Sequence, residues 1–357
     1  MTTDAGPRRE PTGDPVIRFE AARKEYPDGT VAVEGLDLDV REHELLALVG
    51  PSGCGKSTIL RMANRLVELT SGRVLVEGTD VAQVDPVRLR RRIGYVIQDV
   101  GLFPHRTVAQ NIGTVPALLG WDARRTRSRT AELLELVGLE PGTYARRYPH
   151  QLSGGERQRV GVARALAVDP PVLLMDEPFG AVDPEGRRRL QQEFWRIQRE
   201  LGTTVMLVTH DIDEAVRLGD RIAVLSRGGH LEQLSDAVEL LARPAPGMVT
   251  DFVGSGRAVR LLGIGRVTPA DLAPSDEQRP GALHVGARLD DALAALASSG
   301  GEAVPVTGDG GVVVGRLTSQ GLLAALARMV EESGDDAGDR GAGAEVDGPR
   351  GNGQVAR

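Results

Sequence analysis

Residues Gly50 to Thr58 read Gly-Pro-Ser-Gly-Cys-Gly-Lys-Ser-Thr, and this loop constrains the fold more than any other part of the sequence. The pattern G-x-x-x-x-G-K-[ST] is typical of a loop whose backbone amides cradle phosphate groups. The apolar run Leu45–Val49 before it predicts a buried strand, and residues 57–66 predict a helix after it, as such a loop requires. A glycine-rich turn could match by accident, but both flanking elements argue against that. We therefore expect the chain to bind a nucleoside triphosphate.

Lysine use supports the same interpretation. Only Lys24 and Lys56 are lysine among the 43 basic residues, and Lys56 lies in this loop. A compact ammonium fits between the β- and γ-phosphates better than a wide guanidinium does. Cys54, the single cysteine, excludes an internal disulfide and suits a reducing compartment; we interpret it as a loop filler rather than a redox switch. The residues of the loop that we expect to bind the nucleotide are Gly50, Pro51, Ser52, Gly53, Cys54, Gly55, Lys56, Ser57 and Thr58.

The composition is that of an ordinary soluble protein. Hydrophobic residues make up 41% and charged residues 26%, and the net charge of −7 gives no support for nucleic-acid binding. No run approaches the 18 or so consecutive apolar residues that a membrane-spanning helix needs. Residues 1–14 are polar, so we interpret them as a flexible arm rather than a secretory signal.

The order of predicted elements indicates an α/β protein with a small second domain. From 15 to 254, β-like runs alternate with helical patterns, and a mostly helical stretch at 103–167 interrupts them. Residues 255–330 predict a smaller α+β unit with helices at 289–298 and 319–328. Residues 331–357 are acidic and poor in apolar residues, so we expect a disordered tail. The clear strands of the large domain are predicted at 45–49, 93–97, 172–175, 205–208 and 221–225.

Two carboxylates end a buried strand in Val172-Leu-Leu-Met-Asp-Glu-Pro178. Open α/β sheets bind ligands at the carboxyl edge of their strands. We expect Asp176 to hold the hydrated Mg²⁺ and Glu177 to polarise a water that attacks the γ-phosphate. Two charges at a solvated strand end are the alternative, and the phosphate loop upstream makes it much weaker.

A second phosphate-binding surface is predicted at Leu152-Ser-Gly-Gly-Glu-Arg-Gln158, which opens a helix. A Ser-Gly-Gly turn at a helix N-terminus presents unpaired N–H groups beside a hydroxyl, and the helix dipole adds positive charge. A plain serine N-cap would look the same locally. Because one loop already cradles the nucleotide, Ser153, Gly154 and Gly155 are expected to bind the nucleotide of a second subunit.

These motifs, in this order, resemble the nucleotide-binding subunit of ABC transporters over residues 16–254. The resemblance implies roles for four more residues. Tyr26 would stack on the adenine, and Gln98 would reach Mg²⁺ and the attacking water. Asp183 would lie in a loop that crosses to the other subunit, and His210 would contact the γ-phosphate. Each has an ordinary structural alternative, such as a strand aromatic for Tyr26, but the motifs occur together and in order.

The resemblance also favours a transport motor over the ABC ATPases of DNA repair, chromosome organisation or translation. Those proteins carry long coiled-coil insertions or two fused ATPase domains, whereas about 50 residues separate Gln98 from Ser153 here. In the family, the region after the glutamine receives a helix of the membrane permease. The segment Gly101-Leu-Phe-Pro-His-Arg-Thr-Val108, apolar at Leu102 and Phe103, is therefore the expected docking segment, with a buried loop as the alternative.

A narrower resemblance concerns the importers of glycine betaine, choline, carnitine or proline. It rests on Ile97-Gln-Asp-Val-Gly-Leu-Phe-Pro-His105, on Val108–Pro116 and on Asp211–Val216. It implies an ATPase that works as a homodimer or pair of ATPase subunits, with ATP and Mg²⁺, on the cytoplasmic face of the plasma membrane. The implied partners are permease subunits and an extracytoplasmic solute-binding protein. Importers of another small polar solute, such as an amino acid, share most of these motifs, and a non-transport ABC ATPase is a more distant alternative.

Residues 284–328 resemble a CBS module, on the pattern Ala303-Val-Pro-Val306, turn, Val312–Thr318, helix. The roughly 75 residues available are too few for a pair of such modules, so we expect a single or degenerate one. Gly321 stands where adenosine-binding modules usually carry an aspartate, which argues against nucleotide sensing. We favour a packing or dimer-stabilising role.

Overall fold

The computed structural model describes residues 12–98, 100–180, 182–275 and 283–340, and these fall into two compact units. Unit 1 contains residues up to 240 and 244–254, and unit 2 contains residues 241–243 and those from 255 onward. No helix among the described residues is long and apolar enough to cross a membrane.

A six-stranded sheet forms the centre of unit 1, with strand order β10-β9-β3-β8-β7-β6. Strands β9, β3, β8, β7 and β6 are parallel, and only β10 pairs antiparallel at its edge. The carboxyl ends of the parallel strands therefore lie on one edge of the sheet. The bounds are β3 Leu45–Val49, β6 Ile93–Val96, β7 Val172–Asp176, β8 Thr204–Val208, β9 Arg221–Leu225 and β10 Leu231–Ser235.

Alternate residues of these strands face two separate cores. Leu46 and Leu48 of β3 belong to one core, whereas Leu45 belongs to the other. The first core is closed by helix α1 and an antiparallel sheet of order β2-β1-β4-β5, and the second core is closed by helices. The bounds are β1 Thr12–Glu25, β2 Val31–Glu42, β4 Ser71–Val76, β5 Thr79–Asp80, α1 Lys56–Ala63 and α2 Pro86–Arg92. A strand that is buried on both faces reads as a continuous apolar run, which explains the sequence pattern.

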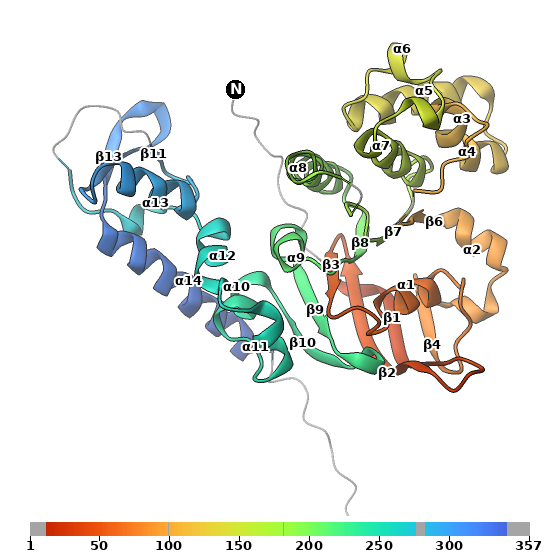
Figure 1. Cartoon of the computed structure of the whole chain (residues 1–357), viewed down its shortest axis with the longest axis horizontal. Coiled ribbons are helices and arrows are strands. Elements are labelled where there is room, and N and C mark those ends of the chain that lie inside the picture. Colours follow the sequence, from red (N-terminus) through yellow and green to blue (C-terminus); the bar gives the residue numbers. More distant parts are fainter. Residues whose placement is uncertain (1–11, 99, 181, 276–282, 341–357) are drawn as a thin grey trace, which may run out of the picture. The chain divides into compact units, whose positions relative to one another are not determined.

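The predicted helical stretch is present as five helices between β6 and β7 (Figure 1). The long helix α8 and the short helix α9 follow in the same unit and contribute to the second core together with α7. The bounds are α3 Val108–Ile112, α4 Thr114–Leu118, α5 Ala123–Leu136, α6 Pro141–Tyr144, α7 Gly154–Ala165, α8 Pro184–Leu201, α9 Ile212–Leu218, α10 Ala237–Ala242 and α11 Met248–Val253.

Unit 2 has a three-stranded sheet of order β11-β12-β13 that is covered by two helices. Helix α13 matches the predicted range 289–298, and the Gly-Asp-Gly turn joins β12 to β13 as expected. Whether this unit is a CBS module stays a prediction. The bounds are α12 Arg257–Ile264, β11 Leu283–His284, α13 Leu289–Ser298, β12 Val304–Thr307, β13 Val313–Leu317 and α14 Ser319–Arg340.

Two expectations at the ends of the chain need correction. Strand β1 begins at Thr12, opposite Glu42 of β2, so residues 12–14 are not part of an arm. Helix α14 continues to Arg340, so residues 331–340 are helical rather than disordered. Extending a formed helix costs far less than nucleating one, and the pair Arg328–Glu332 supports the extension. Residues 1–11 and 341–357 lie outside the described residues.

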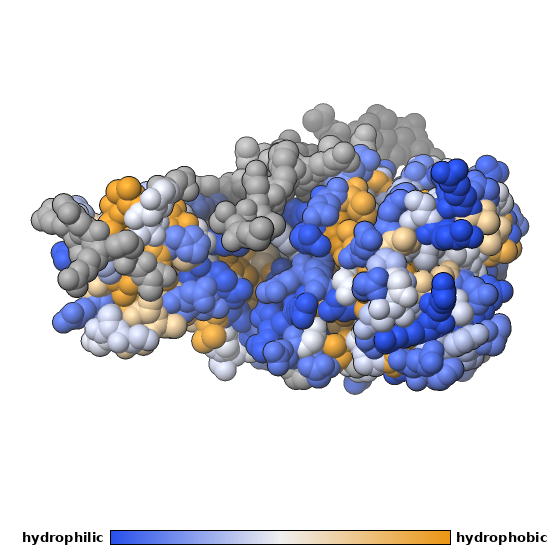
Figure 2. Space-filling model, turned by 90° about the horizontal axis from the view of Figure 1, so that it is seen from above, coloured by the Kyte–Doolittle hydropathy of each residue, from blue (hydrophilic) through white to orange (hydrophobic). Residues whose placement is uncertain are grey.

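The surface in the view of Figure 2 is mainly hydrophilic, with apolar residues in small groups. Large apolar side chains that are exposed include Leu66, Val87, Phe103, Leu118, Leu119, Val259, Leu293, Val312, Val314 and Leu323.

Candidate nucleotide site

The loop that follows β3 needs its glycines for backbone reasons. Gly50, Gly53 and Gly55 have φ values of 150°, 77° and 108°, which L side chains rarely adopt. A Cβ at Gly50 would lie 2.2 Å from the carbonyl oxygen of Leu225, and one at Gly55 would lie 2.3 Å from that of Ala32. The loop is therefore held between β9 and β2, which belong to different sheets, and it leads directly into helix α1.

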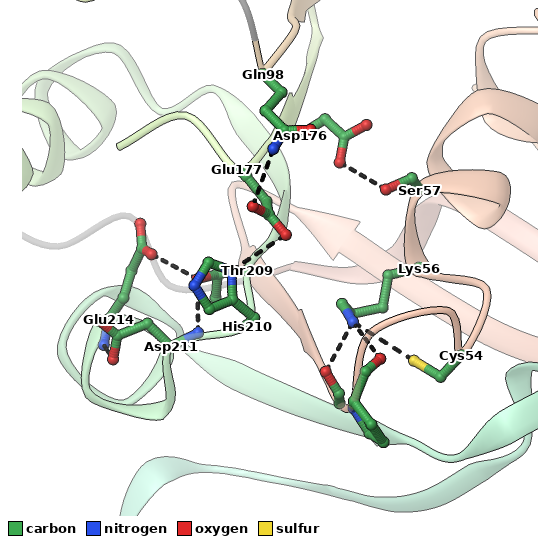
Figure 3. A network of polar contacts seen from close by, with 12 residues as sticks. Cys54, Lys56, Ser57, Gln98, Asp176, Glu177, Thr209, His210, Asp211 and Glu214 are labelled. Carbon is green, nitrogen blue, oxygen red and sulfur yellow. Dashed lines mark hydrogen bonds and ion pairs between the residues drawn. The ribbon is translucent and has the colours of Figure 1, made fainter. Parts of the chain in front are cut away.

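Lys56 is buried, with an exposed fraction of 6%. Its ammonium donates hydrogen bonds to the carbonyl oxygens of Gly50 at 2.7 Å and Pro51 at 2.9 Å, and it lies 3.5 Å from the sulfur of Cys54. Figure 3 shows the side chain folded into the concave side of the loop. Of the other loop residues, Pro51, Ser52 and Gly53 are exposed, and Ser57 and Thr58 are half-buried in the first turn of α1.

Asp176 ends β7 beside the first turn of α1 (Figure 3). The hydroxyl of Ser57 donates to its Oδ1 at 2.8 Å, and a guanidinium nitrogen of Arg61 lies 3.8 Å from its Oδ2. Burial raises the pKa of the Asp176 carboxyl above its ordinary value, while the Ser57 hydrogen bond and the Arg61 charge oppose that shift. A hydroxyl and a carboxylate this close form an oxygen-only donor pair, which is what Mg²⁺ prefers.

Glu177 is contacted by two residues from the ends of neighbouring strands. Its Oε1 lies 3.1 Å from Nδ1 of His210, which follows β8, and its Oε2 accepts from the Gln98 amide, which follows β6, at 3.4 Å. The backbone of Glu177 has φ of 46°, a left-handed conformation that is costly for a residue with a side chain and is typical of functional sites. Its N–H donates to the carbonyl of Val208 at 2.9 Å, which fixes this turn on β8.

The site residues predicted at four separate places in the sequence thus meet at the carboxyl edge of the sheet. These places are the loop 50–58, Gln98, the pair Asp176–Glu177 and His210.

Tyr26 directly follows β1. Strand β2, which comes next, carries Ala32, and the carbonyl oxygen of Ala32 lies against the loop at Gly55. The Lys24 ammonium lies 5.1 Å from the centre of the Tyr26 ring. Ser153 does not join this group. Among the described residues, its hydrogen bonds are made with Glu156 and Arg157, within the first turn of its own helix.

Comparisons with known proteins identify the family. The sequence model of the ABC transporter family matches residues 33–180. The glycine betaine uptake system ATP-binding protein YehX of Escherichia coli (strain K12) is 49% identical over 294 residues, covering 82% of this chain and 94% of YehX. The chain belongs to the ATP-binding proteins of ABC transporters.

Further similarities agree with this family. The glycine betaine/carnitine/choline transport ATP-binding protein OpuCA of Bacillus subtilis (strain 168) is 49% identical over 245 residues. That match covers 69% of this chain but only 64% of OpuCA, so the chain spans less than two thirds of that relative's length. A dimeric post-hydrolysis state of the ATP-binding cassette MJ0796 bound to ADP and Pi has a TM-score of 0.56 and 34% identity, covering 62% of this chain and 98% of that one. The α/β fold predicted from the sequence, that of an ABC cassette, is confirmed.

The Ser-Gly-Gly turn of this ABC protein begins helix α7. Ser153 is the N-cap: its hydroxyl accepts from the N–H of Glu156, and the Glu156 carboxylate accepts from the N–H of Ser153. Asp183 is the exposed N-cap of α8, where its carboxylate accepts from the N–H of Gly186 at 2.9 Å. A Cβ at Gly155 would lie 3.6 Å from Val182, so the turn and the segment before Asp183 are neighbours.

Sequence reasoning missed Arg164, which anchors the segment after Gln98. Its guanidinium donates to the carbonyl oxygens of Val100 at 2.6 Å and Gly101 at 2.7 Å. Both residues have left-handed backbones, with φ of 52° and 54°. Arg164 lies on α7, so the helix that begins at the Ser-Gly-Gly turn also holds the glutamine segment in place. No sequence pattern indicated this contact.

A buried pair fixes the turn that carries His210 (Figure 3). Thr209 donates its hydroxyl proton to Oε2 of Glu214 at 2.5 Å and accepts from the N–H of Asp211 at 3.0 Å. The other oxygen of Glu214 has no hydrogen-bond partner among the described residues. Burial, followed by the charge of Asp211, raises the pKa of Glu214 to about 7, against the opposing effects of Thr209, Arg187 and His210.

We expect Glu214→Gln to stabilise the protein at alkaline pH and to change little at pH 5. The Glu214 carboxyl titrates near 7 in the folded chain but near 4.5 when unfolded. The free energy of unfolding therefore falls as pH rises from about 4.5 to about 7, by about 1.4 kcal/mol for each unit of pKa difference. A glutamine stays neutral and still accepts from Thr209, so the variant should gain at least about 1 kcal/mol at pH 8.

Thermal unfolding at pH 5 and pH 8 measures this difference. The matched control is Glu232→Gln, the same chemical change at an exposed position of β10. An equal gain at both pH values would contradict the prediction, because a packing effect does not depend on the ionisation of Glu214.

Proposed function

We propose that this chain is the ATP-hydrolysing subunit of an ABC importer that drives uptake of a compatible solute through a separate membrane permease. The observation that supports ATP hydrolysis is the meeting of Lys56, Asp176 and Glu177 with His210 at the carboxyl edge of one sheet. The direction and solute class are supported by the relatives, which are named as uptake or transport proteins for glycine betaine, carnitine or choline.

Each side chain of the site has a definite task in this proposal. The loop amides and Lys56 bind the phosphates, and Tyr26 stacks on the adenine. Ser57, Asp176 and Gln98 would hold Mg²⁺, which supplies charge neutralisation on the phosphate oxygens when bound. Glu177 accepts the proton of the attacking water, and His210, 3.1 Å from it, contacts the γ-phosphate.

A second copy completes the site. Gly155 lies in the first turn of α7 with no left-handed φ, and among the described residues a Cβ there would meet Val182 alone, at an ordinary 3.6 Å. Nothing in the part of the protomer that the structure describes therefore requires a glycine, which is a poor residue for a helix. A nucleotide approaching from outside does require one, and the related cassette bound to ADP and Pi is a dimer. Ser153, Gly154 and Gly155 would then contact the partner's ATP, and Asp183 would lie at the interface.

The segment 101–108 is the proposed contact with the permease. Phe103 is 39% exposed, whereas Leu102 packs against the second core and holds the segment down. The rings of Phe103 and His105 lie 6.1 Å apart, and His105 also lines a cavity of about 1020 Å³. Helices α3 to α5 supply most of its wall, including Leu134, and Trp121 lines it from the connection between α4 and α5. An exposed apolar side chain next to a residue that lines such a cavity suits a docked helix.

This assignment implies a peripheral protein at the cytoplasmic face of the plasma membrane, bound to permease subunits and fed by an extracytoplasmic solute-binding protein. Unit 2 would serve as a CBS-like packing or dimer-stabilising module. Since none of these residues touches the solute, an importer of another small polar solute, such as an amino acid, is the second candidate.

Uptake of labelled glycine betaine, choline and carnitine at high osmolarity tests the proposal. The host cells lack other importers of these solutes and carry the native chain, Glu177→Gln, or the control Glu185→Gln at an exposed position of α8. We expect uptake to be lost only with Glu177→Gln. Failure of the native chain to support uptake of any of the three would remove the compatible-solute assignment and favour the amino-acid alternative.

A further inference from the structure

A chain of hydrogen bonds links the end of helix α6 to the Ser-Gly-Gly turn. Tyr144, the last residue of α6, donates its hydroxyl proton to Oε1 of Glu156 at 2.6 Å. The other oxygen of that carboxylate accepts from the N–H of Ser153 at 2.7 Å, and the N–H of Glu156 donates to the Ser153 hydroxyl oxygen at 3.2 Å. Both oxygens of Glu156 are thus engaged on the protomer's own groups.

This arrangement leaves the turn in a state suited to an anion. The Ser153 oxygen accepts from Glu156, so its own proton is free to be donated outward. A helix start has four N–H groups without an acceptor inside the helix, and the box formed by Ser153 and Glu156 uses two of them. The N–H groups of Gly154 and Gly155 are those that remain for a ligand.

The negative charge of the Glu156 carboxylate at the same time disfavours the binding of an anion at this turn. It is a negative charge at the very turn that would bind a phosphate, and like charges a few ångströms apart repel. The Tyr144 hydroxyl is the first cause of a lowered pKa of Glu156, so the carboxylate stays ionised. The guanidinium of Arg147 lies 4.4 Å from the centre of the Tyr144 ring and holds the ring against this side of the turn.

We propose that Tyr144 is a positioning residue: its hydroxyl holds the Glu156 carboxylate back on the protomer so that the Ser153 turn can bind the phosphate of the partner's ATP. The inference rests on the proposed function, because it assumes that this turn contacts ATP in a dimer. Without the hydroxyl, one carboxylate oxygen is released toward the turn and opposes the incoming phosphate.

The test is ATP-dependent dimerisation of the full chain in the hydrolysis-deficient Glu177→Gln background. Sedimentation velocity at increasing MgATP gives the midpoint of dimer formation for four proteins: the background, Tyr144→Phe, Glu156→Gln and the double variant. A glutamine keeps the N-terminal cap, because it still accepts from the Ser153 N–H, but it carries no charge. The phenylalanine loses a single oxygen, so all four proteins are expected to fold.

We expect Tyr144→Phe to raise the MgATP concentration at the midpoint of dimer formation about five-fold, which corresponds to the free energy of about one hydrogen bond. In the Glu156→Gln background the same change should have less than about a two-fold effect, because no charge is left to be released. The ratio between the midpoints of Tyr144→Phe and the background should also decrease as ionic strength rises, because mobile ions screen the repulsion between the Glu156 carboxylate and the phosphate.

Four results would overturn the inference. An unchanged midpoint for Tyr144→Phe would show that the hydroxyl has no role in dimerisation. An equal effect of Tyr144→Phe with and without Glu156→Gln would mean that Tyr144 has only a packing role. An effect that does not depend on ionic strength would mean the same. Failure of the background protein itself to dimerise with MgATP would instead overturn the proposed function, and the inference with it.

Discussion

Glu177→Gln should bind ATP, form a stable ATP-bound dimer and hydrolyse ATP at least about 100-fold more slowly than the native chain. The amide matches the carboxylate in shape and can keep its contacts with Gln98 and His210, but it cannot accept a proton from water. The strained turn at residue 177 is unaffected, because the change is confined to the end of the side chain. Phosphate release at saturating MgATP and sedimentation with and without MgATP measure the two effects.

The matched control is Glu185→Gln, which makes the same chemical change at an exposed position eight residues further along. It should hydrolyse ATP at the native rate. Native-like hydrolysis by Glu177→Gln would show that Glu177 does not accept the proton, and the base would have to be sought elsewhere.

The second large effect is expected for Lys56→Arg, which retains the positive charge. Lys56 is 6% exposed, and its ammonium lies within 2.9 Å of two carbonyl oxygens on the concave side of the loop. A planar guanidinium is wider and needs its donors satisfied in one plane, so it does not fit this space. We expect the affinity for MgATP to fall at least about 100-fold, as measured by equilibrium dialysis.

Lys24→Arg is the control, because Lys24 is the only other lysine of the chain. Its ammonium lies over the Tyr26 ring, and an arginine can make the same cation–π contact. Affinity should change less than about three-fold. If Lys56→Arg bound MgATP as tightly as the native chain, the loop would not distinguish the two cations, and the argument from lysine use would be wrong.

Much of the fold and the meeting of the site residues could be predicted because both follow from short-range patterns. The loop 50–58, the pair Asp176–Glu177 and His210 each follow an apolar run long enough to be a buried strand. Parallel strands of one sheet end at one edge, so the residues after them must converge. For this convergence, the structure had to add only the strand order, which puts β3 beside β8 and β8 beside β7.

What could not be predicted depends on contacts between distant residues. The hydrogen bonds of Arg164 to the segment after Gln98 join residues that are 63 and 64 positions apart in the sequence. Tyr144 meets Glu156 only because the chain turns back between α6 and α7. The burial of Glu214 depends on how α9 packs in the folded chain. The left-handed backbone of Glu177 is imposed by its hydrogen bond to Val208 and has no sequence signal.

Because Cys54 carries the single thiol of the chain, chemical modification of this thiol can report the opening of the nucleotide loop. Cys54 is fully buried beneath the loop, 3.5 Å from the Lys56 ammonium, so a thiol reagent can reach it only when the loop opens. Because no other cysteine competes for the reagent, the rate of modification of the whole protein measures the opening of this one segment. The unmodified sequence is therefore ready for kinetic labelling, without the cysteine-free background that such experiments usually need.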